Sequence, residues 1–167
     1  MKIINILCLV LMVPELVLAK KISVSPTLAI KVPFTIQENA DLVGLNSKYL
    51  NIKGKEKSTL IVTYNKPSTV ANTESVSRYW KTAQEQVAVS SKSIKDLGCK
   101  RLDADLFKCQ RTSMQSDNFI SEILFWKGKT DLVLLRLTSN TSLDTVNKIG
   151  KAIQVETNKR KVAGAQK

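Results

Sequence analysis

Cys99 and Cys109 are the side chains with the clearest potential for chemistry, because thiols can bind metals, act as nucleophiles or form disulfides. A zinc site takes its ligands from cysteine, histidine and carboxylate groups, and this chain has no histidine and only one other cysteine, near its start. A cysteine nucleophile needs a histidine base, and a redox catalyst favours a C-x-x-C spacing at the start of a helix. We therefore expect neither a metal site nor cysteine catalysis.

The same two cysteines flank a short polar segment, Asp103–Asp105, which has the composition of a turn. Antiparallel pairing around Ala104 places residue 99 opposite residue 109, within reach of a disulfide. An exported chain meets an oxidising environment, in which disulfides persist. We predict a Cys99–Cys109 disulfide that closes a hairpin and stabilises the fold by roughly 2–3 kcal/mol.

The remaining polar residues form no catalytic constellation that we recognise. Asp103 and Asp105 lie at the predicted hairpin tip, where water screens their charge. A Ser–Lys dyad needs a desolvated lysine, and the stretch 90–93 has the composition of a solvated surface. The six glycines are scattered and build no phosphate-binding loop. We predict a non-catalytic protein without metal or cofactor; the alternative is a small carboxylate- or Ser/Lys-dependent hydrolase acting on acidic cell-wall material.

The chain is strongly basic: 26 lysine and arginine residues against 14 aspartate and glutamate residues give a net charge of +12. Such an excess attracts anions over distances that salt screens. Arginine is scarce and aromatic residues make up 5% of the chain, so we expect no specific nucleic-acid recognition. The expected partner is an envelope protein, an anionic polymer or a lipid surface. The competing interpretation is that the charge only keeps the protein soluble.

Basic residues gather in three places that are candidates for anion binding: a predicted turn, the C-terminal tail and the stretch 92–111. The strongest candidates come from the turn and the tail, and are Lys53, Lys55, Lys57, Lys159, Arg160 and Lys161. The basic residues of the third place are Lys92, Lys95, Lys100, Arg101, Lys108 and Arg111.

Residues 1–19 have the order of a secretory signal peptide: Lys2, an apolar run from Ile3 to Val13, a break at Pro14, and Val17-Leu18-Ala19 at the expected cut. The apolar run is shorter than the roughly 20 residues that span a bilayer. We predict cleavage after Ala19 and export to the periplasm or the extracellular space, with no transmembrane span left. An uncleaved anchor is the alternative.

The rest of the chain is predicted to form one domain, residues 20–156, followed by a disordered basic tail, 157–167. A Pro-interrupted strand over 22–36 precedes a hairpin of 49–53 and 59–64. A helix starts at Asn72 or Thr73 and ends at Gly98, and a second helix covers 142–155. Four strands lie between the helices, at 99–102, 106–114, 118–126 and 131–138. Strands that cluster in this way predict an α+β fold, with a largely antiparallel sheet flanked by helices.

The strand FISEILFW carries apolar side chains on both faces, which predicts a central strand covered on each side. Phe119, Ile123 and Phe125 are expected on one face, and Ile120, Leu124 and Trp126 on the other.

This order of elements resembles the PsbP-like family of α/β sandwiches, which includes the DcrB-type envelope proteins of bacteria. The resemblance covers residues 28–156 and rests on strands such as KVPFTI and STLIVTY and helices such as ESVSRYWKTAQEQV and LDTVNKIGKAI. It implies a sandwich fold and a non-enzymatic accessory or binding domain, often exported. The family has no catalytic signature to match, so the resemblance assigns no role to any residue.

Overall fold

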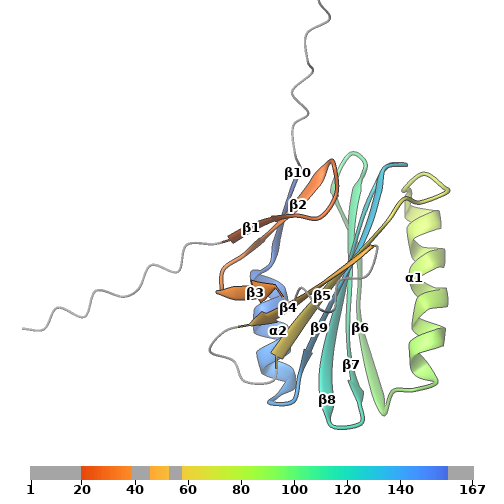
Figure 1. Cartoon of the computed structure of the whole chain (residues 1–167). Helices are drawn as coiled ribbons and strands as arrows, with labels where there is room; N and C mark the ends of the chain where they lie inside the picture. The colour runs from red at the N-terminus through yellow and green to blue at the C-terminus, as the bar shows by residue number, and fades with distance from the viewer. Residues whose placement is uncertain (1–19, 39–45, 53–57, 158–167) are drawn as a thin grey trace, which may run out of the picture.

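A computed structural model describes residues 20–38, 46–52 and 58–157 of the chain (Figure 1). These residues form a seven-stranded sheet, in the order β3-β4-β5-β9-β8-β7-β6, and a three-stranded sheet, in the order β1-β2-β10. Every strand pair in both sheets is antiparallel. The predicted α+β class with a largely antiparallel sheet is therefore confirmed.

Strands β7, β8 and β9 of the large sheet agree with the predicted ranges to within one residue, whereas β6 begins at Ser93, six residues before the predicted strand 99–102. Their bounds are β3 (Ile36–Glu38), β4 (Ser47–Ile52), β5 (Ser58–Asn65), β6 (Ser93–Asp103), β7 (Leu106–Gln115), β8 (Asn118–Lys127) and β9 (Asp131–Ser139). The small sheet consists of β1 (Lys20–Ser23), β2 (Leu28–Val32) and β10 (Gln154–Thr157). The predicted hairpin of 49–53 and 59–64 corresponds to β4 and β5, which pair with Leu50 opposite Leu60.

Helix α1 (Thr73–Ala88) begins where the sequence predicts, because Asn72 and Ser75 form a capping box at its N-terminus. The Ser75 backbone N–H donates to Asn72 Oδ1 at 2.8 Å, and the Asn72 backbone N–H donates to Ser75 Oγ at 3.1 Å. This reciprocal capping box satisfies two N–H groups that the helix itself leaves free. Val76 and Trp80 are the buried residues of the helix, so this face packs on the sheet.

Helix α2 (Leu143–Ala152) is capped by Ser142, whose Oγ accepts a hydrogen bond from the Thr145 backbone N–H at 3.1 Å. Val146, Ile149 and Gly150 are buried against the sheet. The predicted helix extended further, to Val155. Instead the chain turns at Ile153 into β10, which pairs with β2.

The prediction that the first helix continues to Gly98 is wrong. The helix ends at Ala88, and Gly98 lies inside β6. Gly98 has a φ of 78°, and together with Leu97 it stands opposite the single residue Gln110, which makes a β-bulge. A glycine with positive φ marks a helix end or a bulge equally well, so the sequence signal was real but was assigned to the wrong element.

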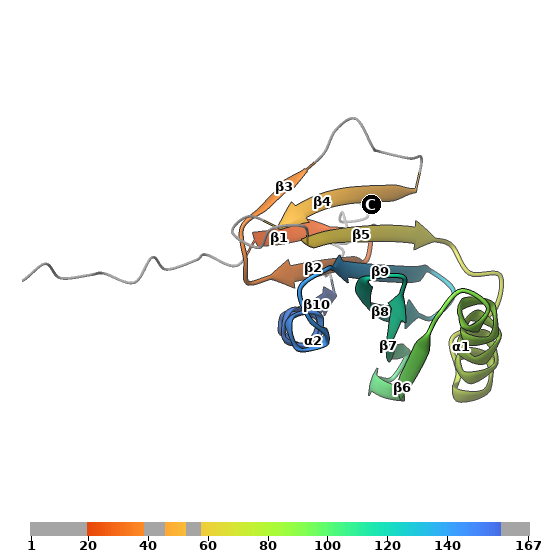
Figure 2. The same ribbon diagram turned by 90° about the horizontal axis from the view of Figure 1, so that it is seen from below.

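The large sheet is covered on both faces, as the alternation in β8 predicts. Ile123 and Phe125 belong to one apolar cluster, and Leu124 and Trp126 to another. We call the side of Ile123 and Phe125 the α2 face, because α2 and the small sheet pack there. The side of Leu124 and Trp126 is the α1 face, against which Trp80 packs. Figure 2 shows β7 and β8 between the two helices.

The small sheet ties both ends of the described chain to the α2 face. Glu156 of β10 forms ion pairs of 3.1 Å with Lys21 of β1 and Lys31 of β2. The last residue of β10, Thr157, pairs with Leu28. Residue 157 was predicted to begin the disordered tail, but it belongs to β10, because β2 offers it an edge to pair with.

Candidate functional site

The predicted basic turn and basic tail lie outside the described residues, as does the predicted signal peptide at 1–19. This concerns all six anion-binding candidates of the turn and the tail: Lys53, Lys55, Lys57, Lys159, Arg160 and Lys161. The described residues do include the third concentration of basic residues, between 92 and 111.

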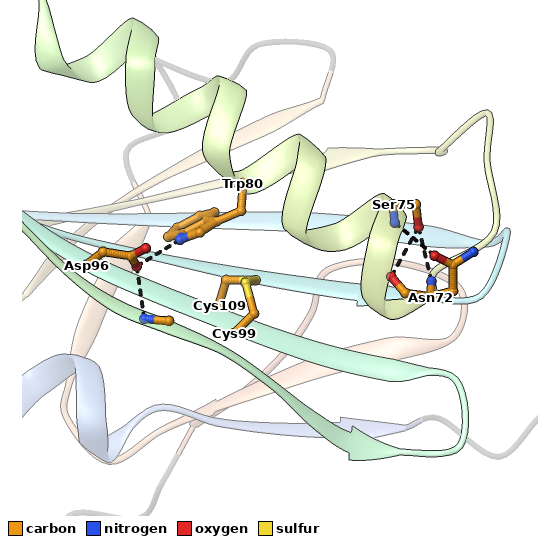
Figure 3. Close-up of a disulfide and its surroundings, with 7 residues drawn as sticks. Asn72, Ser75, Trp80, Asp96, Cys99 and Cys109 are labelled. Carbon is orange, nitrogen blue, oxygen red and sulfur yellow. Dashed lines mark hydrogen bonds between the residues drawn. A yellow bond between two sulfur atoms is a disulfide. The ribbon is translucent and has the colours of Figure 1, made fainter.

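Cys99 and Cys109 face each other across the β6–β7 hairpin, in the register that the sequence predicts. Their sulfur atoms lie 1.97 Å apart, the separation of a disulfide bond. Cys109 is fully buried beneath α1, close to Trp80, whereas Cys99 lies on the exposed edge strand (Figure 3). The pair connects β6 to the sheet directly after the Gly98 bulge. Cys99 also lines two surface pockets, one on each side of β6, which are described next.

The first of these pockets has a volume of about 350 Å³ and opens on the α2 face of the sheet. Three lysines from three different elements line it: Lys100 of β6, Lys108 of β7 and Lys151 of α2. No aspartate or glutamate is among the lining residues. Within the described chain, none of the three lysines takes part in an ion pair. We call this cavity the basic pocket; converging cations without a counter-ion make it attractive to an anion.

Lys108 is the innermost of the three cations. It is half-buried, and its Nζ lies 5.7 Å from the centroid of the Phe125 ring, with which it makes a cation–π contact. Lys100 stands directly opposite Lys108 across the strand pair. Burial lowers the pKa of Lys108 below its ordinary value, and the positive charge of Lys100 lowers it further. Like charges in opposed positions destabilise a sheet, so this pair costs the fold some stability in the absence of an anion.

We expect the Lys108→Met substitution to stabilise the protein at neutral pH by about 0.5 kcal/mol, or roughly 1–2 °C in Tm. The estimate is small because solvent screens a half-buried charge and the contact with Phe125 is lost. A lowered pKa in the folded state means that the unfolded chain binds more protons, so wild-type stability rises with pH between the two pKa values. The advantage of the variant should therefore disappear at alkaline pH. Urea unfolding at several pH values measures it, and a variant less stable than wild type at pH 7 would contradict the expectation.

The inner wall of the basic pocket is formed where α2 approaches the sheet at Gly150. A Cβ atom at this position would lie 3.1 Å from Ser121 Oγ and 3.5 Å from Gln110 Nε2. A larger residue would be tight here, so the glycine favours the close approach of the helix to the side chains of β7 and β8. Gln110 Nε2 is buried and has no hydrogen-bond partner among the described residues. Gln110 also lines the pocket, but its buried Nε2 lies towards Gly150 of α2.

A second pocket, of about 310 Å³, lies on the α1 face between α1 and β6. Ser77, Lys81 and Asp96 line it, so a hydroxyl, an ammonium and a carboxylate group are close together. The Asp96 carboxylate is already engaged, because its Oδ1 accepts hydrogen bonds from Trp80 Nε1 at 3.0 Å and from the Gly98 backbone N–H at 2.9 Å (Figure 3). Ser77 and Lys81 are both exposed to solvent, and a solvated lysine is a poor base for a serine nucleophile.

The buried carboxylates lie away from the surface. Glu122 accepts a hydrogen bond of 2.6 Å from Arg111 Nε, and the two side chains are almost entirely buried on the α1 face. Asp131 is buried under the small sheet and accepts a hydrogen bond from Thr27 Oγ1. A substrate would have to displace packed elements to reach either carboxylate, so these groups serve to hold the layers together.

Two further surveys concern the described residues alone. No group of three or more histidine, cysteine, aspartate or glutamate side chains is arranged to hold a metal ion. None of the helices in this part of the chain has the length and apolar character needed to cross a membrane.

Lys151 is the residue of the basic pocket that sequence reasoning missed. It lies 43 positions after Lys108, in a helix for which the sequence analysis considered only the capping residues and the apolar positions. A signal that points to it is Gly150, a small residue on the buried side of α2, since a glycine there indicates close contact with the sheet. The residues between 92 and 111 had been recognised as basic, but nothing local shows that Lys100 and Lys108 share a face with α2.

Comparison with known proteins identifies no family for the chain. No protein-family model matches it, and no curated protein matches it. Among solved structures it is similar to the solution structure of cyanobacterial PsbP (CyanoP) from Synechocystis sp. PCC 6803, with 7% sequence identity and a TM-score of 0.47. The match covers 77% of this chain and 86% of that chain. The resemblance noted in the sequence thus has a structural counterpart of low similarity.

Proposed function

We propose that this protein is an exported, non-catalytic binding module that holds an anionic group of an envelope partner in the basic pocket. The observation that carries the proposal is the convergence of Lys100, Lys108 and Lys151 around one cavity that no carboxylate of the described residues lines. Export is supported by the signal-like order of residues 1–19 and by the paired cysteines, since disulfides persist outside the cytoplasm.

Two features favour an anion over a neutral ligand. The lysines come from β6, β7 and α2, so the fold itself brings the charges together rather than a flexible lysine-rich loop. An anion would relieve the repulsion between Lys100 and Lys108. Net charge alone is compatible with mere solubility, but a cavity that concentrates unpaired cations is not explained by solubility.

The non-catalytic part of the proposal rests on what surrounds the half-buried lysine. A Ser/Lys-dependent hydrolase needs a hydroxyl group beside a desolvated lysine. The residues that line the basic pocket with Lys108 include no serine, threonine or carboxylate. The α1-face pocket has Ser77 and Lys81, but both are solvent-exposed. The pocket that has the suitable lysine thus lacks the nucleophile, and the pocket that has the nucleophile lacks the suitable lysine.

The direct test is the triple substitution Lys100→Gln, Lys108→Gln and Lys151→Gln, assayed by isothermal titration with a short inorganic polyphosphate. We expect binding to weaken by tenfold or more, because three cations and their convergence are lost. A matched control, Lys66→Gln, Lys81→Gln and Lys129→Gln, removes the same charge from exposed positions outside the basic pocket and should change affinity less than threefold. Wild-type binding should weaken steeply with salt and again as pH rises through the lowered pKa of Lys108.

Two further variants compare the basic pocket with the candidates predicted from the sequence. One replaces Lys53, Lys55 and Lys57 by glutamine, and the other deletes residues 158–167, which spares β10. If these changes abolish binding and the pocket variant does not, the anion site lies in the turn or the tail and the proposal is wrong. If no variant and no change of salt affects binding, the positive charge serves solubility.

A further inference from the structure

A second cavity lies on the α2 face next to the basic pocket. It has a volume of about 120 Å³ and is mainly apolar, with Met114 of β7, Phe119 of β8 and Leu143 of α2 among its lining residues. Leu143 is 37% exposed, so this opening reaches the surface. A cavity of roughly 150 Å³ takes up a benzene molecule, which means that this one has room for about one branched or aromatic side chain. We call it the apolar pocket.

The two pockets lie on the same side of β7, and we call the surface between them, together with the pockets, the groove. Met114, Thr112, Gln110 and Lys108 alternate along β7 and all point to the α2 face, since each stands opposite an odd-numbered residue of β8 on that face. The first two line the apolar pocket and the last two line the basic pocket. The groove floor is thus β7 with its edge neighbour β6, and α2 forms the wall.

The distance between the pockets can be estimated in two independent ways, from the rise per residue of β7 and from that of α2. Along β7 the pairs 112/114 and 108/110 are separated by four residues, or about 13 Å in a strand. Along α2, Leu143 and Lys151 are separated by eight residues, or about 12 Å in a helix. The agreement indicates that the helix and the strand run side by side over this length. A ligand that fills both pockets therefore has an apolar group and an anionic group about 12–13 Å apart.

We propose that the groove binds an extended acidic segment of a partner protein, which inserts one apolar side chain into the apolar pocket and, four residues away, one carboxylate into the basic pocket. In an extended chain, residues i and i+4 point to the same side and lie about 13 Å apart, which matches the spacing of the pockets. The inference rests on the proposed anion-binding function and specifies the kind of partner. It assigns the carboxylate to the site where Lys100, Lys108 and Lys151 meet.

A protein segment fits this groove better than a lipid. The apolar pocket accommodates a single side chain but not an acyl chain. A short extended segment, by contrast, carries one apolar side chain and one carboxylate on the same side of its backbone at the spacing of the two pockets.

Fluorescence anisotropy with short labelled peptides tests the inference. The parent peptide carries one leucine and one glutamate four residues apart on a serine and threonine background. Two comparison peptides either shorten the spacing to three residues, which turns the groups to opposite sides, or replace glutamate by glutamine. We expect each comparison peptide to bind at least about tenfold more weakly than the parent.

The protein variants distinguish failure of the inference from failure of the proposed function. Leu143→Ser should weaken the parent peptide about tenfold but leave polyphosphate binding unchanged, whereas Val89→Ser, an exposed apolar control at the end of α1, should affect neither. If Leu143→Ser and the altered spacing have no effect while the lysine variant still loses polyphosphate, the acidic-segment inference is wrong and the anion site stands. If the lysine variant keeps both ligands, the proposed function fails with it. Preferential binding to phosphatidylglycerol vesicles over the parent peptide, lost in Leu143→Ser, would also overturn the inference in favour of a lipid.

Discussion

Replacing Glu122 by alanine is expected to lower the free energy of unfolding by about 3–5 kcal/mol. The substitution leaves Arg111 in the interior without its counter-ion, and Arg111 is only 2% exposed. Glu122 is its counter-ion, and the distance between Arg111 Nε and Glu122 Oε2 is 2.6 Å. The guanidinium also lies 4.4 Å from the centroid of the Trp80 ring, so the unpaired charge would disturb the contact between α1 and the sheet. Urea unfolding followed by tryptophan fluorescence measures the loss.

Three control variants separate burial from charge. Glu122→Gln keeps the volume and one acceptor oxygen, and should cost less than Glu122→Ala. The double variant Arg111→Met, Glu122→Leu removes both charges and should recover most of the stability, because a buried ion pair can often be replaced by apolar side chains. Glu74→Ala breaks the exposed ion pair with Arg78 at the start of α1 and should cost less than about 1 kcal/mol. Equal losses for Glu74→Ala and Glu122→Ala would contradict the role of burial.

Replacing both Cys99 and Cys109 by alanine is expected to cost about 2–3 kcal/mol, because the cross-link closes a loop with a sequence separation of 10 and restricts the unfolded chain. The same variant should become insensitive to reducing agents, whereas wild-type Tm should fall towards that of the variant when a reductant is added. Hydrogen exchange should accelerate most in β6, which pairs with β7 alone in the described sheet.

Thiol labelling of the native, unreduced protein provides the independent check on this cross-link. Neither Cys99 nor Cys109 should react before reduction, although Cys99 lies on an exposed strand. Labelling of both would contradict the disulfide and reopen the possibility of a redox pair. Labelling that appears only after reduction, together with an unchanged far-UV spectrum, would show that the fold survives without the bond.

The sequence alone determined the parts of the structure that depend on neighbours along the chain. The alternation in FISEILFW assigned Ile123 and Phe125 to one face and Leu124 and Trp126 to the other, which is what the two apolar clusters show. The pairing of residue 99 with residue 109 followed from the position of one short turn. The start of α1 followed from Asn72, whose side chain competes locally for the first helical N–H groups. The cysteines that pair are separated by 10 positions, and the capping partners Asn72 and Ser75 by only three, so short stretches of sequence are enough to predict both.

Only the tertiary structure decided the elements whose partners are distant in sequence. β10 exists because β2 offers it a free edge more than a hundred residues earlier in the chain, and nothing in Gln154–Thr157 itself requires a strand. Gly98 could have ended a helix, but pairing with β7 made it part of a bulge. The basic pocket is the clearest case: Lys151 joins Lys100 and Lys108 because Gly150 lets α2 pack closely on the sheet. Local preferences set the form of each element, whereas burial of apolar faces sets which elements meet, and a site made from three elements depends on the second.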